Sequence, residues 1–214
     1  VFEAGHPVPD SKGFEATTNA VDMLANADED TMVVCLISGG GSALLVAPHS
    51  GVTLEEKQRV TQLLFRAGAD IDELNAVRKH ISRVKGGRLA EIAFPAQVVS
   101  LILSDVIGDK LDVIASGPTS PDRSSYRDAL DVINKYQLSK EVPENIVNML
   151  RMGVRRKIPE TPKQKDPVFE AVENVIIGNN SKATEAAKAK AVELGFDTTV
   201  LTSQLQGEAR EIGR

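Results

Sequence analysis

The chain has 214 residues, 42% of them hydrophobic and 26% charged, with a formal net charge of −5. This composition is ordinary for a globular protein with a sizeable core. The net negative charge does not indicate a surface that binds nucleic acid. No apolar stretch approaches the roughly 20 residues that span a bilayer, and no signal peptide is visible. We therefore expect a cytoplasmic protein without nucleic-acid or membrane partners. Because Cys35 is the single cysteine, no internal disulfide can form. We expect Cys35 to be a small buried hydrophobic residue and not a nucleophile.

Apolar runs and amphipathic stretches alternate along the chain. Continuous runs rich in β-branched residues predict strands that are covered on both faces, as in a parallel sheet. They lie at 32–37, 98–103, 175–177 and 198–201. Helical patterns lie at 14–26, 54–69, 74–93, 122–136, 143–153 and 181–194. Thr53 and Glu56 form a capping box for the second pattern, and Gly86-Gly87 weakens the middle of the third. We expect Asp122 to cap the fourth pattern and Asn180 to cap the last. The alternation predicts a three-layer, Rossmann-like α/β fold with a mainly parallel sheet. We expect 33–37 and 98–103 to be neighbouring or near-neighbouring parallel strands.

The segment 155–167 and the two ends of the chain bear on its domain organisation. Residues 155–167 contain three prolines and five basic residues, which favours a solvated connector over a binding patch. The chain opens without an initiator Met and closes, at 207–214, with what reads as the start of a helix. We expect one domain over 1–214 that is truncated at its N-terminus.

The strongest local motif is the glycine loop, Ser38-Gly39-Gly40-Gly41-Ser42, directly after the first apolar run. Glycines let the backbone turn sharply and approach a ligand, their N–H groups can face an anion, and a following helix adds its positive end. The alternative is a tight turn without a ligand. The loop lacks the Gly-Lys-Ser/Thr ending of a P-loop and the spacing of a dinucleotide fingerprint.

A second set of candidates follows the run at 98–103. Asp105 and Asp109 lie four positions apart and could hold Mg²⁺, or one could accept a proton from a hydroxyl nucleophile. An Asp-rich capping turn is the alternative. Ser116 and Gly117 lie in a small-residue loop nearby that suits close backbone approach to a ligand.

Basic residues form the third set. Arg78, Lys79, Lys85 and Arg88 fall within eleven positions and could neutralise phosphates, although a solvated helix face is favoured by this pattern alone. His80 reads as a structural histidine.

A stiff segment with two prolines surrounds His6 and Asp10. It either presents both side chains to a ligand or starts a helix after a rigid turn, and the residues give no preference.

Four motifs together resemble the class II glycerate kinase (glycerate 2-kinase) family, whose members are sometimes labelled hydroxypyruvate reductase. In order they are AGHPVPD at 4–10, LISGGGSAL at 36–44, NAVRKH at 75–80 with KGGRL at 85–89, and LSDVIGD at 103–109 with ASGPTSPD at 115–122. The resemblance implies that ATP and D-glycerate give 2-phosphoglycerate and ADP, with Mg²⁺. It also implies a cleft between a Rossmann-like N-terminal domain and a C-terminal domain.

Two features that the resemblance implies are missing: a Gly-Lys-Ala-type motif before Val1 and a glycine-rich domain after Arg214. We therefore expect these 214 residues to be inactive alone. Their substrates would be glycerate and ATP, and homo-oligomerisation stays open.

The residues and the resemblance agree on phosphoryl transfer, which needs positioning and charge neutralisation more than covalent catalysis. Gly39–Gly41 would cradle a phosphate or the glycerate carboxylate, Asp105 and Asp109 would orient Mg²⁺ or the acceptor hydroxyl, and Arg78, Lys79 or Lys85 would balance phosphate charge.

Which loop holds ATP stays open, and so do two alternatives. An NAD-linked hydroxypyruvate reductase predicts a dinucleotide fingerprint, which this chain lacks. A non-catalytic phosphosugar- or acid-binding module would need neither paired carboxylates nor Mg²⁺.

Overall fold

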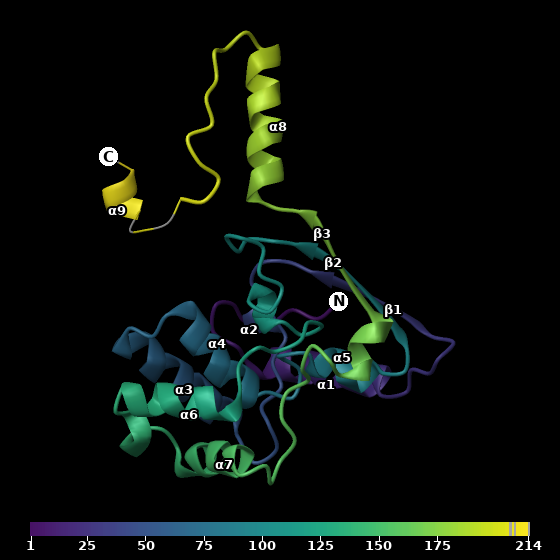
Figure 1. Cartoon of the computed structure of the whole chain (residues 1–214), viewed down its shortest axis with the longest axis vertical. Helices are drawn as coiled ribbons and strands as arrows, with labels where there is room; N and C mark the ends of the chain where they lie inside the picture. The colour runs from purple at the N-terminus through teal and green to yellow at the C-terminus, as the bar shows by residue number, and fades with distance from the viewer. Residues whose placement is uncertain (206, 208, 214) are drawn as a thin grey trace.

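The structure, a computed structural model, describes residues 1–205, 207 and 209–213 (Figure 1). Its strands are β1 (Met32–Ile37), β2 (Gln97–Leu103) and β3 (Val172–Gly178). Its helices are α1 (Ser11–Leu24), α2 (Gly41–Leu44), α3 (Leu54–Ala67), α4 (Ile71–His80), α5 (Arg88–Ala93), α6 (Tyr126–Lys135), α7 (Glu144–Val154), α8 (Asn180–Glu193) and α9 (Ala209–Ile212). Short 3₁₀ turns lie at Ile114–Ser116, Leu138–Lys140 and Pro167–Ala171.

The three strands form one parallel sheet in the order β1-β2-β3. Val33 pairs with Val98, and Val98 pairs with Val172. The predicted α/β class and the parallel pairing of the first two strands are therefore confirmed. Because parallel strands end at the same edge, the loops that follow β1, β2 and β3 meet there, which is where open α/β sheets bind ligands.

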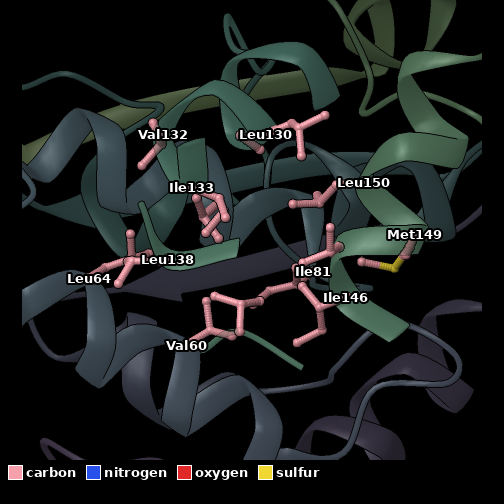
Figure 2. Close-up of a cluster of buried hydrophobic side chains, with 14 of the residues drawn as sticks. Val60, Leu64, Ile81, Leu130, Val132, Ile133, Leu138, Ile146, Met149 and Leu150 are labelled. Carbon is pink, nitrogen blue, oxygen red and sulfur yellow. The ribbon is translucent and has the colours of Figure 1, made fainter. Parts of the chain in front are cut away.

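Helices α3, α4, α6 and α7 pack into a compact group beside the sheet (Figure 1). Figure 2 shows their shared core, in which Val60 and Leu64 of α3 lie near Ile133 of α6 and Ile146 of α7. Each fully buried side chain of this kind contributes roughly 1.5–3 kcal/mol. Capping boxes begin α3, α4 and α6, and that of α3 joins Thr53 to Glu56 as predicted.

One face of the sheet is covered and the other is open in the described part of the chain. On the covered side, α1 and α5 contribute to a second core around Val21, Val84 and Leu89, with Cys35 packed against it. On β1, Met32 and Leu36 are exposed. Helix α8 has no buried residue and projects away from the rest (Figure 1). A covering layer on each face, as a three-layer fold requires, is thus not seen among the described residues.

Four details of the predicted elements are wrong. No strand forms at 198–201, where Leu201 is 93% exposed, because an apolar run needs a neighbouring strand to pair with. The helix predicted at 74–93 is split, since Gly86 and Gly87 adopt φ angles of +61° and +83° between α4 and α5. Ser125, not Asp122, caps α6, and Asn179, not Asn180, caps α8.

The segment 155–167 combines exposed and docked parts. Residues 155–157 are exposed, whereas Thr161 and Pro162 are buried, and Thr161 donates a hydrogen bond of 3.0 Å to Asp122. Within the described residues, we find no helix with the length and apolar character that crossing a bilayer requires.

Candidate functional site

The glycine loop lies at the carboxyl edge of the sheet, between β1 and α2, and separates two functional groups. A Cβ added at Gly39 would lie 2.5 Å from Oδ2 of Asp105, so this carboxylate packs directly on the loop backbone. On the neighbouring residue, Gly40, a Cβ would lie 3.2 Å from the His6 ring, and the φ angle of +80° strongly favours glycine there. The loop therefore places His6 and Asp105 against adjacent glycines.

The expected helix contribution to anion binding is small, because α2 spans only Gly41–Leu44. A single turn aligns too few peptide dipoles to produce a substantial positive end. Positive charge at this site must come from side chains.

A cavity of about 340 Å³, here named the cationic pocket, opens beside the loop on the His6 side. Helix α3, helix α4, the glycine loop and the N-terminal segment form its walls. It is lined by His6, Pro7, Val8, Pro9, Gly40, Ser42, Ala43, Lys57, Gln58, Thr61, Gln62, Phe65 and Arg78.

Three cations gather at this pocket. Lys57 and Arg78 line it, and the ammonium group of the fully buried Lys85 donates to Ser42 Oγ on its wall (3.3 Å). Burial, and secondarily the charge of Arg78, lowers the pKa of Lys57 to about 7. Burial also lowers the pKa of Arg78 to about 10. The pKa of Lys85 is lowered by burial first and then by the charges of Lys57 and Arg78.

None of these three cations forms an ion pair in the part of the chain that the structure describes. Buried charges in proteins are normally paired, because desolvation of a lone charge is costly. An oxyanion in the pocket would supply the missing negative charge. The arrangement therefore fits a carboxylate or a phosphate group.

Lys85 is positioned by a chain of buried hydrogen bonds. Its Nζ also donates to the Ala115 carbonyl (3.3 Å), Ser42 Oγ lies 2.9 Å from Ser116 Oγ, and Ser116 donates to Asn75 Oδ1 (3.0 Å). Residues 115–117 all have φ angles between +51° and +62°, a conformation that is strained for Ala115 and Ser116 and that the surrounding structure must enforce. Gly86 N donates to the Ser116 carbonyl (3.0 Å), which helps to fix it. Ser116 and Gly117 are buried and support the glycine loop from behind.

The carboxylates lie on the other side of the loop. Asp105 is exposed immediately after β2, whereas Asp109 accepts a hydrogen bond from Asn179 Nδ2 (2.6 Å). Hydrogen bonds from Ser104 and Asn179 lower the pKa of Asp109, so it is ionised near neutral pH. Both Asp105 and Asp109 line a hollow of about 280 Å³.

This hollow suits a hard cation. Within the described residues no group of three or more His, Cys, Asp or Glu side chains could enclose a metal ion. Mg²⁺, however, is usually held by one or two carboxylates together with water and substrate phosphates. The carboxylates of Asp105 and Asp109 are oxygen ligands of the type that this ion prefers.

The cationic pocket and the carboxylate hollow are thus divided by one glycine loop, and the sequence that builds them matches a known family. Residues 1–151 match the family described as "Domain of unknown function (DUF4147)". The chain belongs to this family.

Similar proteins carry kinase names. The DUF4147 chain is 46% identical to the "D-glycerate 2-kinase" of Thermotoga maritima and 43% identical to the "Glycerate 2-kinase" of Pyrococcus horikoshii, and in both cases 100% of the chain and 48% of the relative are covered. It is also 44% identical to the "Glycerate kinase" of Mus musculus, over 100% of the chain and 40% of the relative. The chain therefore spans about half the length of these relatives or less.

Two crystal structures agree with the fold. A Pyrococcus horikoshii protein superposes with a TM-score of 0.86 at 43% identity, covering 100% of the chain and 48% of that protein. The glycerate kinase of Thermotoga maritima superposes with a TM-score of 0.85 at 46% identity, covering 99% and 48%.

Other predicted site residues of the DUF4147 chain lie apart from the cationic pocket. Lys79, adjacent to Arg78 on α4, is buried against Asp122 (3.1 Å) and Asp112 (3.6 Å), which neutralise its charge. Burial raises the pKa of Asp122, but the charges of Lys79 and His80 outweigh it and leave that pKa low.

His80 is buried, and its Nε2 lies 2.7 Å from Glu160. Asp10 caps α1 by accepting from Gly13 N (2.9 Å), which lowers its pKa. Ser38 is exposed at the start of the loop and lines a separate, apolar hollow. The predicted residues that share the cationic pocket are His6, Gly40, Ser42 and Arg78, with Lys85 directly behind its wall.

Sequence reasoning missed Lys57. The signal was available, because Lys57, Val60 and Leu64 follow the spacing of one helix face and the other two belong to the core. A lysine on the apolar face of an amphipathic helix is unusual, since lysine is almost never fully buried without a partner.

Proposed function

We propose that this chain contributes the glycine loop, an oxyanion site and a carboxylate pair to an enzyme that transfers the γ-phosphoryl group of ATP to D-glycerate, giving 2-phosphoglycerate and ADP. One observation carries the proposal. An exposed carboxylate, Asp105, packs on the glycine loop beside a pocket lined by Lys57 and Arg78, with Lys85 behind its wall, and none of these three side chains forms an ion pair within the described residues. Phosphoryl transfer requires both elements, cations for the phosphate oxygens and an acceptor or metal ligand at the nucleophile. The kinase names of the relatives support the same reaction.

The residues of this chain would act as follows. Arg78, Lys57 and Lys85 hold an anionic group of a substrate and offset the charge of its oxygens. Asp105 either accepts the proton of the attacking hydroxyl or orients that hydroxyl for attack. The hydroxyl oxygen forms a bond to phosphorus while the bond from phosphorus to the leaving oxygen of ADP breaks. Mg²⁺, for which Asp105 and Asp109 are suitable ligands, would neutralise phosphate charge when it is bound.

The relatives are about twice as long as this chain, and the open face of the sheet offers a surface for further structure. In a complete kinase, we infer that a further layer covers the open face of the sheet at Met32 and Leu36, which would give the three-layer, Rossmann-like arrangement. Burying those side chains would also remove an apolar surface that is rarely left exposed.

The test is an assay for ATP-dependent phosphorylation of D-glycerate by a polypeptide extended to the length of the relatives, with the position of the phosphate assigned by phosphorus NMR. We expect 2-phosphoglycerate, and we expect calorimetric titration to show Mg²⁺-dependent binding of ATP. Reduction of hydroxypyruvate by NADH without phosphoryl transfer would replace the proposal with the reductase. Oxyanion binding without turnover or any effect of Mg²⁺ would replace it with a binding module.

A further inference from the structure

Lys57 has an unusual environment for a lysine. It lies on α3 above the core residues Val60 and Leu64, and only 4% of its surface is exposed. Its aliphatic stem is therefore buried, and the residue lines the cationic pocket. Lysine commonly buries its stem and extends its charged end to a polar space in this way.

The charges around Lys57 oppose its protonation. The charge of Arg78 on α4 lowers the pKa of Lys57, and Lys85 and Lys57 lower the affinity of each other for a proton. His6 of the N-terminal segment also lines the pocket. The neutral polar groups of the lining are Ser42, Gln58, Thr61 and Gln62. No carboxylate in the described part of the chain comes within ion-pair distance of Lys57. An ammonium group placed here without a ligand loses hydration and gains only repulsion.

We propose that Lys57 is a substrate-binding residue whose ammonium group, together with Arg78 and Lys85, binds an oxyanion in the cationic pocket. The choice between the carboxylate of glycerate and a phosphate group rests on the proposed function. The binding of an oxyanion by Lys57 does not depend on it. Beside these basic groups the lining offers the polar side chains of Gln58, Thr61 and Gln62, which can hydrogen-bond the hydroxyl groups of a small acid, and an apolar part with Pro7, Val8 and Phe65.

A proton-uptake signature follows from this placement. Because the pKa of Lys57 is about 7, about nine-tenths of its amino groups are neutral at pH 8 before a ligand binds. An oxyanion favours the charged form, so its binding raises that pKa and draws a proton from solvent. From Lys57 alone we expect uptake of up to about 0.9 proton for each oxyanion bound at pH 8, and Lys85, whose pKa is also lowered, adds to the total if it is neutral before binding. A cation with an ordinary pKa, already charged at pH 8, would show no uptake.

The experiment is calorimetric titration at pH 8 with D-glycerate and, separately, with inorganic phosphate. Each titration is repeated in two buffers that differ in ionisation enthalpy, using a polypeptide extended to the length of the relatives. We expect one probe to bind with proton uptake. Lys57→Met should weaken that probe about 10- to 100-fold and reduce the uptake by up to about 0.9 proton without lowering the melting temperature. Lys57→Arg, which keeps the charge but does not titrate, should retain more affinity and show the same reduced uptake.

The control is Lys188→Met, which removes an exposed lysine of α8 and should change neither affinity nor uptake. The proposal is overturned if neither probe binds, if Lys57→Met binds normally, or if Lys57→Arg takes up as many protons as the wild type. A merely structural Lys57 would lower the melting temperature on substitution and leave affinity unchanged. Because no ATP or turnover is involved, Lys57-dependent binding in a protein without kinase activity would contradict the proposed function alone.

Discussion

Replacing Gly39 by alanine is the sharpest test of how the glycine loop places Asp105. The new Cβ would lie 2.5 Å from Oδ2 of Asp105, so the carboxylate has to retreat by about 1 Å to reach ordinary contact distance. A misplacement of this size at a reacting group can cost about 10²-fold in rate. We therefore expect Gly39→Ala to lower kcat for glycerate phosphorylation by about two orders of magnitude.

Stability should change little in the same variant. Gly39 does not occupy the left-handed region, so alanine fits its backbone, and Asp105 is exposed and free to move. Glycine-to-alanine replacement at a compatible site gains about 0.4–1 kcal/mol through the unfolded chain, which offsets the small cost of moving the carboxylate. The net change in the free energy of unfolding should stay within about 1 kcal/mol.

The assay measures kcat and melting temperature on one preparation of a polypeptide extended to the length of the relatives. Gly178→Ala is the matched control, because its Cβ would lie 2.8 Å from Leu103 Cδ2, an exposed and flexible group that carries no charge. If Gly39→Ala acts through Asp105, the double variant with Asp105→Asn should be no slower than Asp105→Asn alone. Undiminished kcat in a folded Gly39→Ala protein would refute this reasoning.

Three further predictions follow from the same geometry. Asp105→Asn should lower kcat by about 10²–10⁴-fold at an unchanged melting temperature, with a similar or smaller loss for Asp109→Asn; a lower melting temperature at normal turnover would make Asp105 structural. Gly40→Val should abolish oxyanion binding in titrations while unfolding stays cooperative, because a β-branched residue resists the φ angle of +80° and its Cβ would lie 3.2 Å from His6. Glu160→Gln should lower the free energy of unfolding, measured with urea at pH 7, by about 1–2 kcal/mol. Burial raises the pKa of Glu160, but hydrogen bonds from His80 and the Tyr126 amide outweigh burial and lower this pKa from 4.5 to about 2. That stabilisation is complete above pH 4.5 and is lost as the pH falls toward 2, so an equal difference between wild type and variant at pH 7 and at pH 2 would contradict it.

The local elements of this protein are determined largely by its sequence. Continuous β-branched runs predicted β1, β2 and β3, because β-branched side chains favour extended backbone, although one face of the sheet is open in the described chain. The Thr53–Glu56 pair predicted the start of α3, because its side chains satisfy the free N–H groups of the first turn. Position directly after a strand was likewise enough to place the glycine loop and Asp105 at one edge of the sheet, since parallel strands end together.

Only the tertiary structure decided which charges are available to a ligand. Arg78 and Lys79 are neighbours in the sequence, but successive residues point about 100° apart around a helix, so one lines the cationic pocket and the other is neutralised by Asp122. Lys57 joins the pocket only because α3 and α4 pack together, and 198–201 stays irregular because no strand is available to pair with it in the described chain. Sequence patterns report the period of an element and its buried face. The counter-charge that a buried side chain meets depends on segments distant in the sequence, and these come together only when the chain folds.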